Sequence, residues 1–310
     1  MLVTVIMLAY NDAPFVVRTL ESIKAQTYKN IEIIISDDCS TDNTVEVCRK
    51  WLQNNREYFV NSKILTTPVN TGVTANCIRA TAAASGEWLK GIGCDNLMAP
   101  DCIEKFVDFV KNHPTATLVQ CRLQKIDEND IVIGEKMKGP DEIFHDDRTT
   151  AEQQYQLFLR KDPIDALGLF KKKSLLDSLG CYDSEFRNQE DTPFAFRVLK
   201  NGNKIWWINQ PLVQRRMRVG SLSGLSDSSI VSKNNLVRND IDRKYIIPNV
   251  GVLERLILKY KAFLNILFFS SLNKKTRINL FLWKFLSYPI SMFYRYKIKS
   301  IKSYIKNKWN

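Results

Sequence analysis

The sequence predicts an α/β protein in which helices flank a mostly parallel β-sheet. Residues 31–35 form a nearly continuous β-branched run, which is typical of a strand covered on both faces. Asp37 and Asp38 end this run, and Ser40 begins a set of capping side chains for the next helix. Strand-like and helix-like segments also alternate along residues 1–115. Together these observations favour a doubly wound sheet.

The alternating segments follow one another in a simple order. Strands are expected at residues 3–8, 31–35, 64–65 and 88–93, and helices at residues 16–23, 45–52, 73–84 and 103–110. The strands are short apolar or β-branched runs, and the helices repeat apolar residues every three or four positions. Parallel strands joined by helices place their carboxyl ends at one edge, where such sheets bind ligands.

The alternation becomes less regular after Thr117. A strand is expected at residues 119–123, a charged loop at 127–150, and helical structure at 151–180. A later helix should begin near Asp191, and a last strand is expected at residues 206–208.

The net charge of +12 is confined to the end of the chain. Residues 251–310 carry thirteen Lys and Arg against one acid, Glu254, whereas residues 1–250 are neutral. This contrast predicts a domain boundary near residues 248–251 and confines any polyanion-binding surface to the tail. Because nothing besides charge favours nucleic acid, we expect no nucleic-acid partner.

The tail contains two apolar, aromatic segments with interspersed lysines, at residues 252–270 and 278–296. Neither reaches about 20 uninterrupted apolar residues, so we do not expect them to cross a bilayer. Basic and aromatic residues mixed in this way suit amphipathic helices on an anionic membrane surface, which is the preferred expectation. The alternatives are that these helices pack on the rest of the chain or pair with a second subunit in a homo-oligomer.

The cysteine and histidine content indicates a reduced, cytoplasmic protein. Seven cysteines occur without CxxC pairs, which favours buried thiols. Two histidines are too few for a His-based metal site. The first residues lack a basic flank and should form a strand rather than a signal peptide. With the basic tail, these features predict peripheral attachment at the inner face of the cell membrane.

Acidic residues recur at three points: Asp37 with Asp38, Asp95, and Glu190 with Asp191. The first two points follow predicted parallel strands and are therefore expected at one edge of the sheet. Carboxylates there can hydrogen-bond a base or ribose, or hold Mg²⁺ or Mn²⁺ beside phosphates, whereas zinc prefers other ligands. Asp191 could serve as a general base. Taken singly, each acid could instead be a turn or cap residue.

An ordered set of motifs resembles family 2 glycosyltransferases of the GT-A fold, across about residues 2–225. The motifs are TVIMLAYND with LESIKAQTYKNIEIIISDDCSTDNT, then Asn70, Gly72, Asn76 and Gly86-Glu87-Trp88, and finally Asn188-Gln189-Glu190-Asp191 with Phe194 and Arg197. The resemblance implies inverting transfer of a sugar from a nucleotide-diphosphate donor to a hydroxyl, with a divalent cation. Residues 1–250 would be the catalytic domain, with a nucleotide-binding half at about 1–115 and an acceptor half at about 116–250.

The resemblance also implies roles for individual residues. The donor nucleotide would be held by Leu8, Tyr10, Asp37, Asp38, Asn70 and Asn76. Asp95 would bind the Mn²⁺ or Mg²⁺ ion, and Asp191 would deprotonate the acceptor with support from Glu190. The diphosphate would be contacted by Arg216 and Arg218, because a guanidinium forks onto phosphate oxygens and stays charged.

Two positions depart from the family pattern. Cys94 stands before Asp95, where relatives usually carry a second acid, and Arg218 stands where they usually carry His. The loss of one acid should weaken cation binding. We therefore expect Arg218 to take over part of the stabilisation of the leaving group. The alternative is that Arg218 lies on a solvated loop.

The activity implied by the resemblance is hexosyl or N-acetylhexosaminyl transfer, with a UDP-sugar as the preferred donor. The acceptor would be a saccharide or lipid-linked saccharide in bacterial surface polysaccharide synthesis, such as capsule or O-antigen. A nucleotidyltransferase would need a basic phosphate loop, which residues 10–13 do not form. A phospho-receiver module would carry its acidic pair after the first strand, not the second. A catalytically degenerate nucleotide-sugar-binding scaffold is the remaining alternative, because of Cys94.

Overall fold

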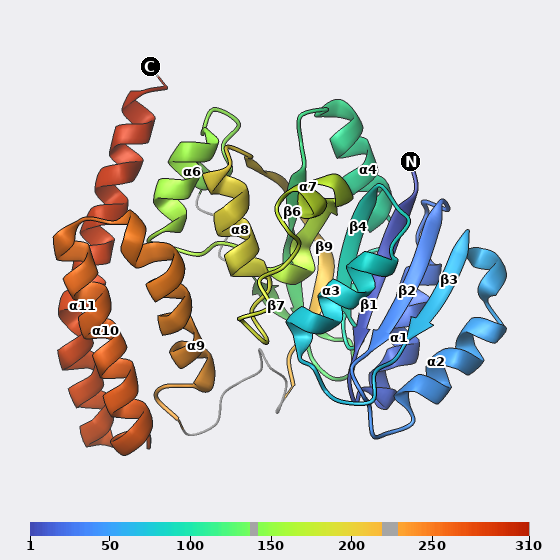
Figure 1. Cartoon of the computed structure of the whole chain (residues 1–310), viewed down its shortest axis with the longest axis horizontal. Coiled ribbons are helices and arrows are strands. Elements are labelled where there is room, and N and C mark those ends of the chain that lie inside the picture. The colour runs from blue at the N-terminus through green and yellow to red at the C-terminus, as the bar shows by residue number, and fades with distance from the viewer. Residues whose placement is uncertain (137–141, 219–228, 310) are drawn as a thin grey trace. The chain divides into compact units, whose positions relative to one another are not determined.

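The computed structural model describes residues 1–136, 142–218 and 229–309 (Figure 1). The chain forms two compact units. The first comprises Met1–Ala151 and Pro163–Met217, and the second comprises Glu152–Asp162 and Arg218–Asn310. The change of composition at residues 248–251 falls inside the second unit, just before one of its helices.

The first unit is built on one sheet, in which nine strands are described. Their bounds are β1 Val3–Ala9, β2 Ile31–Asp37, β3 Asn61–Leu65, β4 Trp88–Gly93, β5 Leu97–Met98, β6 Leu118–Ile126, β7 Val132–Lys136, β8 Leu169–Lys172 and β9 Ile205–Arg216. The order across the sheet is β3-β2-β1-β4-β8-β6-β9-β5, and β7 pairs with β6. Helices lie in front of and behind the strands β1 to β4 (Figure 1).

The half of the sheet from β3 to β4 is parallel. β1 pairs in parallel with β2 and β4, and β2 pairs in parallel with β3. The helices of this half are α1 Ala13–Lys24, α2 Thr44–Gln53, α3 Val73–Ala83 and α4 Cys102–Asn112, with the 3-10 turn η1 Arg56–Tyr58. Every residue of β2 is buried, which confirms the prediction of a strand covered on both faces. The predicted α/β class is confirmed.

The other half corrects the expectation of helical structure at residues 151–180. Its helices α6 (Ala151–Phe158) and α7 (Lys173–Ser178) fit that expectation, but η2 (Ala166–Gly168) and β8 lie between them. β8 is antiparallel to both β4 and β6. Phe170 of β8 stacks on Trp88 and on Phe106, with ring centroids 4.8 Å apart in each pair. These long-range contacts decide the conformation against the local tendency of the flanking residues.

The remaining elements extend or modify the predictions. β6 confirms the strand expected at residues 119–123 and pairs in parallel with β9. β9 continues to Arg216, well beyond the expected 206–208. β7 and α5 (Glu142–His145) lie in the stretch expected to be loop, and α8 (Asp191–Lys200) begins at Asp191 as predicted. Mixed pairing in this half means that only β1 to β4 are uniformly parallel.

The second unit is helical in its described part. It contains α9 Lys233–Ile241, a π-helical segment Asp242–Ile246, the 3-10 turn Ile247–Asn249, α10 Val252–Ser271 and α11 Arg277–Asn307. The two helices predicted in the tail are confirmed. Phe268 of α10 packs on Trp283 of α11 with ring centroids 5.0 Å apart, and Arg160 forms a buried 2.7 Å ion pair with Glu254. Within the described ranges, no helix has both the length and the apolar character needed to cross a membrane.

Candidate active site

Two of the predicted acidic points lie at the carboxyl edge of the parallel half. The strand register places Asp37 of β2 and Gly93 of β4 beside the last two residues of β1. Asp38 and Asp95 follow these strand ends and therefore lie at one edge of the sheet, on either side of β1. This is the edge at which open α/β sheets bind ligands.

Asp38 is buried and accepts three hydrogen bonds from residues beyond its own strand. The donors are the Thr71 hydroxyl at 2.5 Å, the Gly72 amide at 2.6 Å and the Arg79 guanidinium at 3.4 Å. Burial raises the pKa of Asp38, but these hydrogen bonds outweigh burial and hold that pKa below its ordinary value. The ionised carboxylate thus ties the loop before α3 to the end of β2. Its contact with a nucleobase stays a prediction.

The same loop is joined to the segment that precedes α8. The Arg187 guanidinium donates to the Asn70 side-chain oxygen at 2.6 Å, and the Arg187 carbonyl accepts from the Thr74 amide at 3.0 Å. Gly72 lies between these contacts with φ +91°, and an added Cβ would stand 2.3 Å from the Arg187 side chain. Glycine is therefore required by both the backbone angle and the close approach. The loop connects the end of β2 to the start of α8.

Asp37 makes local contacts instead. Its carboxylate accepts hydrogen bonds from the Ser40 amide at 2.9 Å and from the Ser40 hydroxyl. Asp42 similarly accepts from the amide of Thr44, the first residue of α2, at 3.0 Å. The turn-residue interpretation therefore describes Asp37 well, whereas Asp38 makes long-range contacts.

The other residues predicted for the donor site differ in exposure. Tyr10 is 46% exposed just past the end of β1, and Leu8 is half-buried. Asn76 is buried: its side-chain oxygen accepts from the Ser36 hydroxyl at 2.5 Å, and its amide donates to the Ser36 carbonyl at 2.9 Å. Asn76 thus fastens α3 to β2. The exposed ring of Tyr10 is the better placed of these groups to meet a flat ligand ring.

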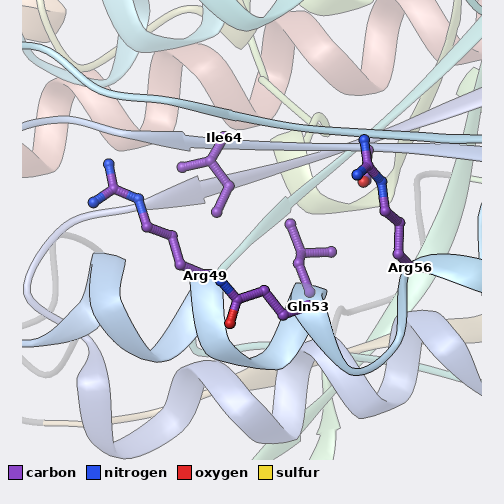
Figure 2. Close-up of a pocket in the computed structure, with 6 residues that line it drawn as sticks. Arg49, Gln53, Arg56 and Ile64 are labelled. Atoms are coloured by element: carbon purple, nitrogen blue, oxygen red, sulfur yellow. The ribbon is translucent and has the colours of Figure 1, made fainter.

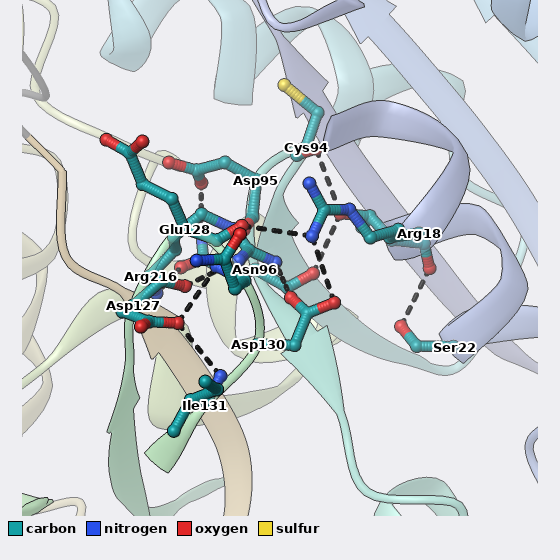
Figure 3. Close-up of polar contacts among 12 residues, drawn as sticks. Arg18, Ser22, Cys94, Asp95, Asn96, Asp127, Glu128, Asp130, Ile131 and Arg216 are labelled. Carbon is teal, nitrogen blue, oxygen red and sulfur yellow. Dashed lines mark hydrogen bonds and ion pairs between the residues drawn. The ribbon is translucent and has the colours of Figure 1, made fainter. Parts of the chain in front are cut away.

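Cys94 does not face the same way as Asp95. Its buried thiol donates to the Asp12 carboxylate at 2.8 Å, and Figure 3 shows it pointing away from the Asp95 side chain. Burial raises the pKa of the Cys94 thiol far above its ordinary value, and Asp12 raises it further. In contrast, a Cβ added at Gly93 would lie 3.3 Å from the Asp95 carboxylate. Positions 93 and 96 both lie close to the Asp95 carboxylate, and the effect of Cys94 on cation binding stays a prediction.

Asp95 fits a cation that is shared with a bound ligand. The described residues include no group of three or more His, Cys, Asp or Glu side chains able to hold a metal by themselves. Asp95 is half-buried, and its carboxylate accepts a hydrogen bond from the Asn96 side-chain amide at 2.5 Å. Mg²⁺ is commonly held by one or two carboxylates together with substrate phosphates rather than by a protein cage. One carboxylate, that of Asp95, meets that requirement once a diphosphate is present.

Arg216, predicted to contact the diphosphate, is fully engaged by protein oxygens. Its side chain is buried, and its guanidinium donates to the Asp95 carbonyl at 2.8 Å, to the Asp127 carbonyl at 2.7 Å and to the Asp130 carboxylate (Figure 3). These contacts favour a role in holding the turn at Asp95 over direct phosphate contact. Arg218 is half-buried two residues beyond β9, and its phosphate contact stays a prediction.

Glu190 immediately precedes α8 and is buried, as are its neighbours Lys171 and Tyr182. Burial raises the pKa of the Glu190 carboxyl, which its own backbone amide and Lys171 offset only in part. Burial alone would lower the pKa of Lys171, but Tyr182, Cys77 and Glu190 outweigh burial and raise it. The Lys171 ammonium also lies 5.3 Å from the centroid of the Tyr182 ring. A buried ammonium on β8 therefore supplies positive charge close to Glu190.

Asp191, the predicted base, is the more accessible of the two acids. It is half-buried at the first position of α8, and its carboxylate accepts from the Thr192 amide at 2.8 Å. A carboxylate at a helix N-terminus is favoured by the helix dipole. Glu190 is thus buried while Asp191 is half-buried, and the division of roles predicted for them stays a prediction.

The chain's relationship to known proteins can now be stated. The sequence profile described as Glycosyl transferase family 2 matches residues 4–178, which is more than half of the chain. The chain belongs to glycosyl transferase family 2. The predicted family is therefore confirmed, and the match covers β1 to β8 with the Asp38 and Asp95 edge.

Three similar curated relatives of this family member come from bacteria. Glycosyltransferase GlyG of Streptococcus pneumoniae is 29% identical over 233 residues, covering 71% of this chain and 72% of the relative. An uncharacterized glycosyltransferase of Haemophilus influenzae is 26% identical over 206 residues, covering 65% and 61%. EpsE of Bacillus subtilis, which has a provisional glycosyltransferase name, is 30% identical over 126 residues, covering 41% and 44%. The match thus spans less than two thirds of the length of each of the last two relatives.

Solved structures share the fold of this family 2 chain. Staphylococcus aureus TarS 1–349 in complex with UDP-GlcNAc has a TM-score of 0.62 at 17% identity, covering 100% of this chain and 91% of that chain. Mannosyltransferase PcManGT of Pyrobaculum calidifontis, in complex with GDP-Man and Mn²⁺, has a TM-score of 0.57 at 17% identity, covering 98% and 84%. At such identities the likeness shows the fold, and it confirms the predicted GT-A architecture.

Three residues that shape this family 2 site, Arg187, Lys171 and Arg79, were not among those predicted from the sequence. Arg187 lies in a loop, and Lys171 lies in a strand that was expected to be helical. Arg79 donates to the Asn76 side-chain oxygen at 2.8 Å as well as to Asp38. The three-residue spacing of Asn76 and Arg79 on one helix face could have indicated this partnership.

A separate cavity of about 220 Å³ lies at the outer edge of the parallel half (Figure 2). It is lined by residues of α2, η1 and β3, namely Arg49, Leu52, Gln53, Arg56, Ser62 and Ile64. None of these residues belongs to the predicted site. The cavity is therefore separate from the candidate active site.

Proposed function

We propose that this chain is an inverting glycosyltransferase that moves a sugar from a nucleotide-diphosphate donor to a hydroxyl of its acceptor. Its membership of glycosyl transferase family 2 supports the reaction type. The observation that carries the proposal is the position of Asp38 and Asp95 at one edge of the sheet, beside the loop joined to α8. Donor groups at that edge and the predicted base on α8 would then share one region of the first unit.

The chemical step is a direct displacement. The Asp191 carboxylate takes the proton of the acceptor hydroxyl while that oxygen bonds to the anomeric carbon, and the bond from this carbon to the diphosphate oxygen breaks. General-base assistance of this kind contributes about 10²–10⁴-fold. Glu190 and Lys171 form the charged surroundings of Asp191, and Arg218 would stabilise charge on the departing diphosphate. Attack from the opposite face inverts the anomeric configuration.

A divalent cation would be held by Asp95 and the donor phosphates, as Mn²⁺ or Mg²⁺. It would supply positive charge against the leaving diphosphate. The structural neighbour PcManGT was determined with Mn²⁺, which supports divalent metal use in this fold. Asp95 is the residue of this chain assigned to that cation.

A UDP-linked hexose or N-acetylhexosamine is the proposed donor. The TarS neighbour was determined with UDP-GlcNAc, and the ring of Tyr10 offers a surface for a uracil ring. The proposed acceptor is a saccharide or lipid-linked saccharide of a bacterial surface polysaccharide. The chondroitin and hyaluronan synthases of Pasteurella multocida, each 32% identical to this chain over 116 residues, support a polysaccharide setting.

The experiment that tests this function is a donor screen. Thermal unfolding is measured with UDP, GDP and their sugars, with and without Mn²⁺, and transfer to saccharide acceptors is followed by NMR. We expect a UDP-sugar with Mn²⁺ to raise the unfolding temperature, since a ligand at 100 times its Kd adds about 2.7 kcal/mol of stability. The product should have the inverted anomeric configuration. Binding without any transfer or donor hydrolysis would favour the degenerate scaffold instead.

We also propose that the tail attaches the enzyme peripherally to the cytoplasmic face of the membrane. α11 carries an apolar stripe at helical spacing that is 44–73% exposed, formed by Ile278, Phe281, Phe285, Tyr288 and Met292. The exposed basic residues Lys284, Arg295 and Lys299 lie along the border of this stripe. Apolar side chains flanked by lysines and arginines suit the interface of an anionic bilayer.

Vesicle co-sedimentation tests the membrane proposal. The full chain should bind vesicles containing phosphatidylglycerol, and binding should fall with salt and with the variant Phe281→Glu/Phe285→Glu. Val60→Glu/Val69→Glu changes two exposed apolar residues of the first unit and is the matched control. Equal loss in both variants, or a stripe-dependent dimer without vesicle binding, would contradict the proposal.

A further inference from the structure

A buried arginine joins the turn at Asp95 to a second turn between β6 and β7 (Figure 3). Arg216 ends β9 and is only 1% exposed. Its backbone amide donates to the Asn96 side-chain oxygen at 3.0 Å, and its guanidinium donates to the Asp95 carbonyl at 2.8 Å. The other two guanidinium nitrogens reach Asp127 and Asp130 of the second turn. One side chain thus holds two turns together.

The second turn is held from α1 as well. The Asp130 carboxylate is shared by Arg216 and by Arg18, whose guanidinium lies 3.0 Å from it. Arg18 also donates to the Glu128 carbonyl at 3.0 Å. Burial raises the pKa of Asp130, but the two guanidinium groups outweigh burial and lower it. Asp130 is therefore an ionised bridge between two cations from different elements.

The turn at Asp95 is fixed from its other side by the residue after Arg18. The Thr19 hydroxyl donates to the carbonyls of Cys94 and Asn96, at 2.9 and 2.8 Å. The ring of Phe15, one helical turn earlier, lies 5.0 Å from the Arg216 guanidinium carbon and 5.2 Å from that of Arg18. The backbone around Asp95 therefore lies between α1 and Arg216, with polar contacts to both.

A charge as deeply buried as that of Arg216 is costly unless all its donors are satisfied. Here each guanidinium nitrogen meets a protein oxygen, and two of these oxygens are backbone carbonyls at fixed places in turns. A planar fork with several donors fits this arrangement, whereas a lysine offers one point of charge. The geometry therefore requires arginine specifically at position 216.

We propose that Arg216 is a positioning residue, which through the carbonyl of Asp95 and the side chain of Asn96 directs the Asp95 carboxylate toward the donor diphosphate and its cation. Asp130 and Arg18 keep the guanidinium in place. The inference rests on the proposed function, since it assigns Asp95 to the cation shared with the diphosphate. In this proposal Arg216 does not make the direct phosphate contact that the sequence predicted. It acts on the diphosphate site through its contacts with Asp95 and Asn96.

The test measures nucleotide binding by calorimetry, with and without Mn²⁺, using UDP or GDP, whichever the wild-type chain binds more tightly. In Arg216→Gln we expect the gain in affinity that Mn²⁺ provides to fall by about 10–100-fold, as for other residues that orient a metal ligand. Affinity without Mn²⁺ should change little, because the nucleobase residues lie beyond β2 and β1. Arg216→Lys should recover only part of the gain.

Arg215→Gln is the matched control. Arg215 is the preceding residue of β9. It is half-buried, and its guanidinium forms an ion pair with Asp165 at 2.5 Å rather than with the turn at Asp95. It should lower stability without changing the gain from Mn²⁺. Asp130→Asn keeps the shape of the bridge while removing its charge, and should reduce the gain less than Arg216→Gln. This milder variant provides the test should Arg216→Gln fail to fold.

The outcomes separate the inference from the function on which it rests. If the folded Arg216 and Asp130 variants keep the full gain from Mn²⁺ while wild type shows it, the positioning role is wrong and the proposed function stands. If Arg215→Gln loses the gain equally, the effect is general destabilisation and the inference is also overturned. If wild type binds no nucleotide with Mn²⁺, the proposed function itself fails.

Discussion

The two halves of the sheet contribute opposite charges to the candidate site. The parallel half ends in the carboxylates Asp38 and Asp95, which follow β2 and β4. The other half contributes buried cations, Lys171 from β8 and Arg216 from β9. The carboxylates follow strand ends at the edge where such sheets bind ligands, whereas the cations belong to the strands themselves and contact protein groups. The second half therefore adds buried positive charge beside acids and turns that the parallel half also holds, through Arg79 and Thr19.

The largest effect should follow removal of the proposed base. This substitution should slow the chemical step without changing donor binding. Asp191→Asn should reduce the rate of transfer by about 10²–10⁴-fold while nucleotide affinity stays near that of wild type. Single-turnover assays with calorimetry of donor binding measure the two quantities separately. Asp177→Asn, at an exposed position in α7, is the control. If Asp191→Asn transferred sugar at the normal rate, Asp191 could not be the catalytic base.

A second prediction concerns the cation in β8. Lys171→Met should lower the free energy of unfolding by about 3–5 kcal/mol, because it leaves Glu190 buried without its neighbouring positive charge. Adding Glu190→Gln should restore part of this loss if the two charges are coupled. Denaturant unfolding of both single variants and the double variant measures the coupling. Additive losses would show that Lys171 acts independently of Glu190.

A smaller effect is expected at the edge of the parallel half. Asp38→Asn should cost about 1.5–3 kcal/mol of stability, as for other hydrogen bonds to a charged group, because it weakens the bonds to Thr71, Gly72 and Arg79. Hydrogen exchange should show the Gly72 amide opening sooner. Asp101→Asn, at a partly exposed position immediately before α4, should change neither the stability nor the exchange of the Gly72 amide. An unchanged Gly72 amide would mean that Arg187 alone holds the loop.

The smallest predicted effect is a change in pH dependence. The pKa of Glu190 is raised in the folded state, so folding is penalised as pH rises from the ordinary glutamate pKa through the raised value. Glu190→Gln should therefore be more stable relative to wild type at neutral pH than at pH about 3, where the Glu190 carboxyl is mostly protonated in both states. Thermal unfolding across this pH range measures the difference. A constant difference would indicate that Glu190 titrates normally.

The sequence indicated the carboxylates of the parallel half because a strand pattern and the acid that ends it are neighbours in the chain. Asp38 and Asp95 both follow runs whose alternation with helices specifies a parallel sheet. The orientation of Cys94 was not available in this way, because Cys94 lies in the turn after β4 and its thiol partner, Asp12, is distant in the chain. Its place beside Asp12 depends on how α1 packs against the turn after β4.

The cations could not be predicted for a related reason. β8 is four residues long and is stabilised by pairing with β4 and β6, so the residues around Lys171 carry no strand pattern of their own. Arg216 was recognised as a candidate, but its role depends on turns at residues 95–96 and 127–130 that are remote in the chain. Asp191 was easier to place because a helix start has a local signature.

The amino-acid sequence alone determined the family, the parallel strands with their terminal acids, and the two helices of the basic tail, because each depends on residues close together in the chain. Tertiary structure decided which side chains enclose Asp38, where Cys94 points, and what Arg216 contacts. Hydrogen bonds between distant segments form only after the sheet has assembled, and a buried charge takes whichever partners that assembly brings within reach.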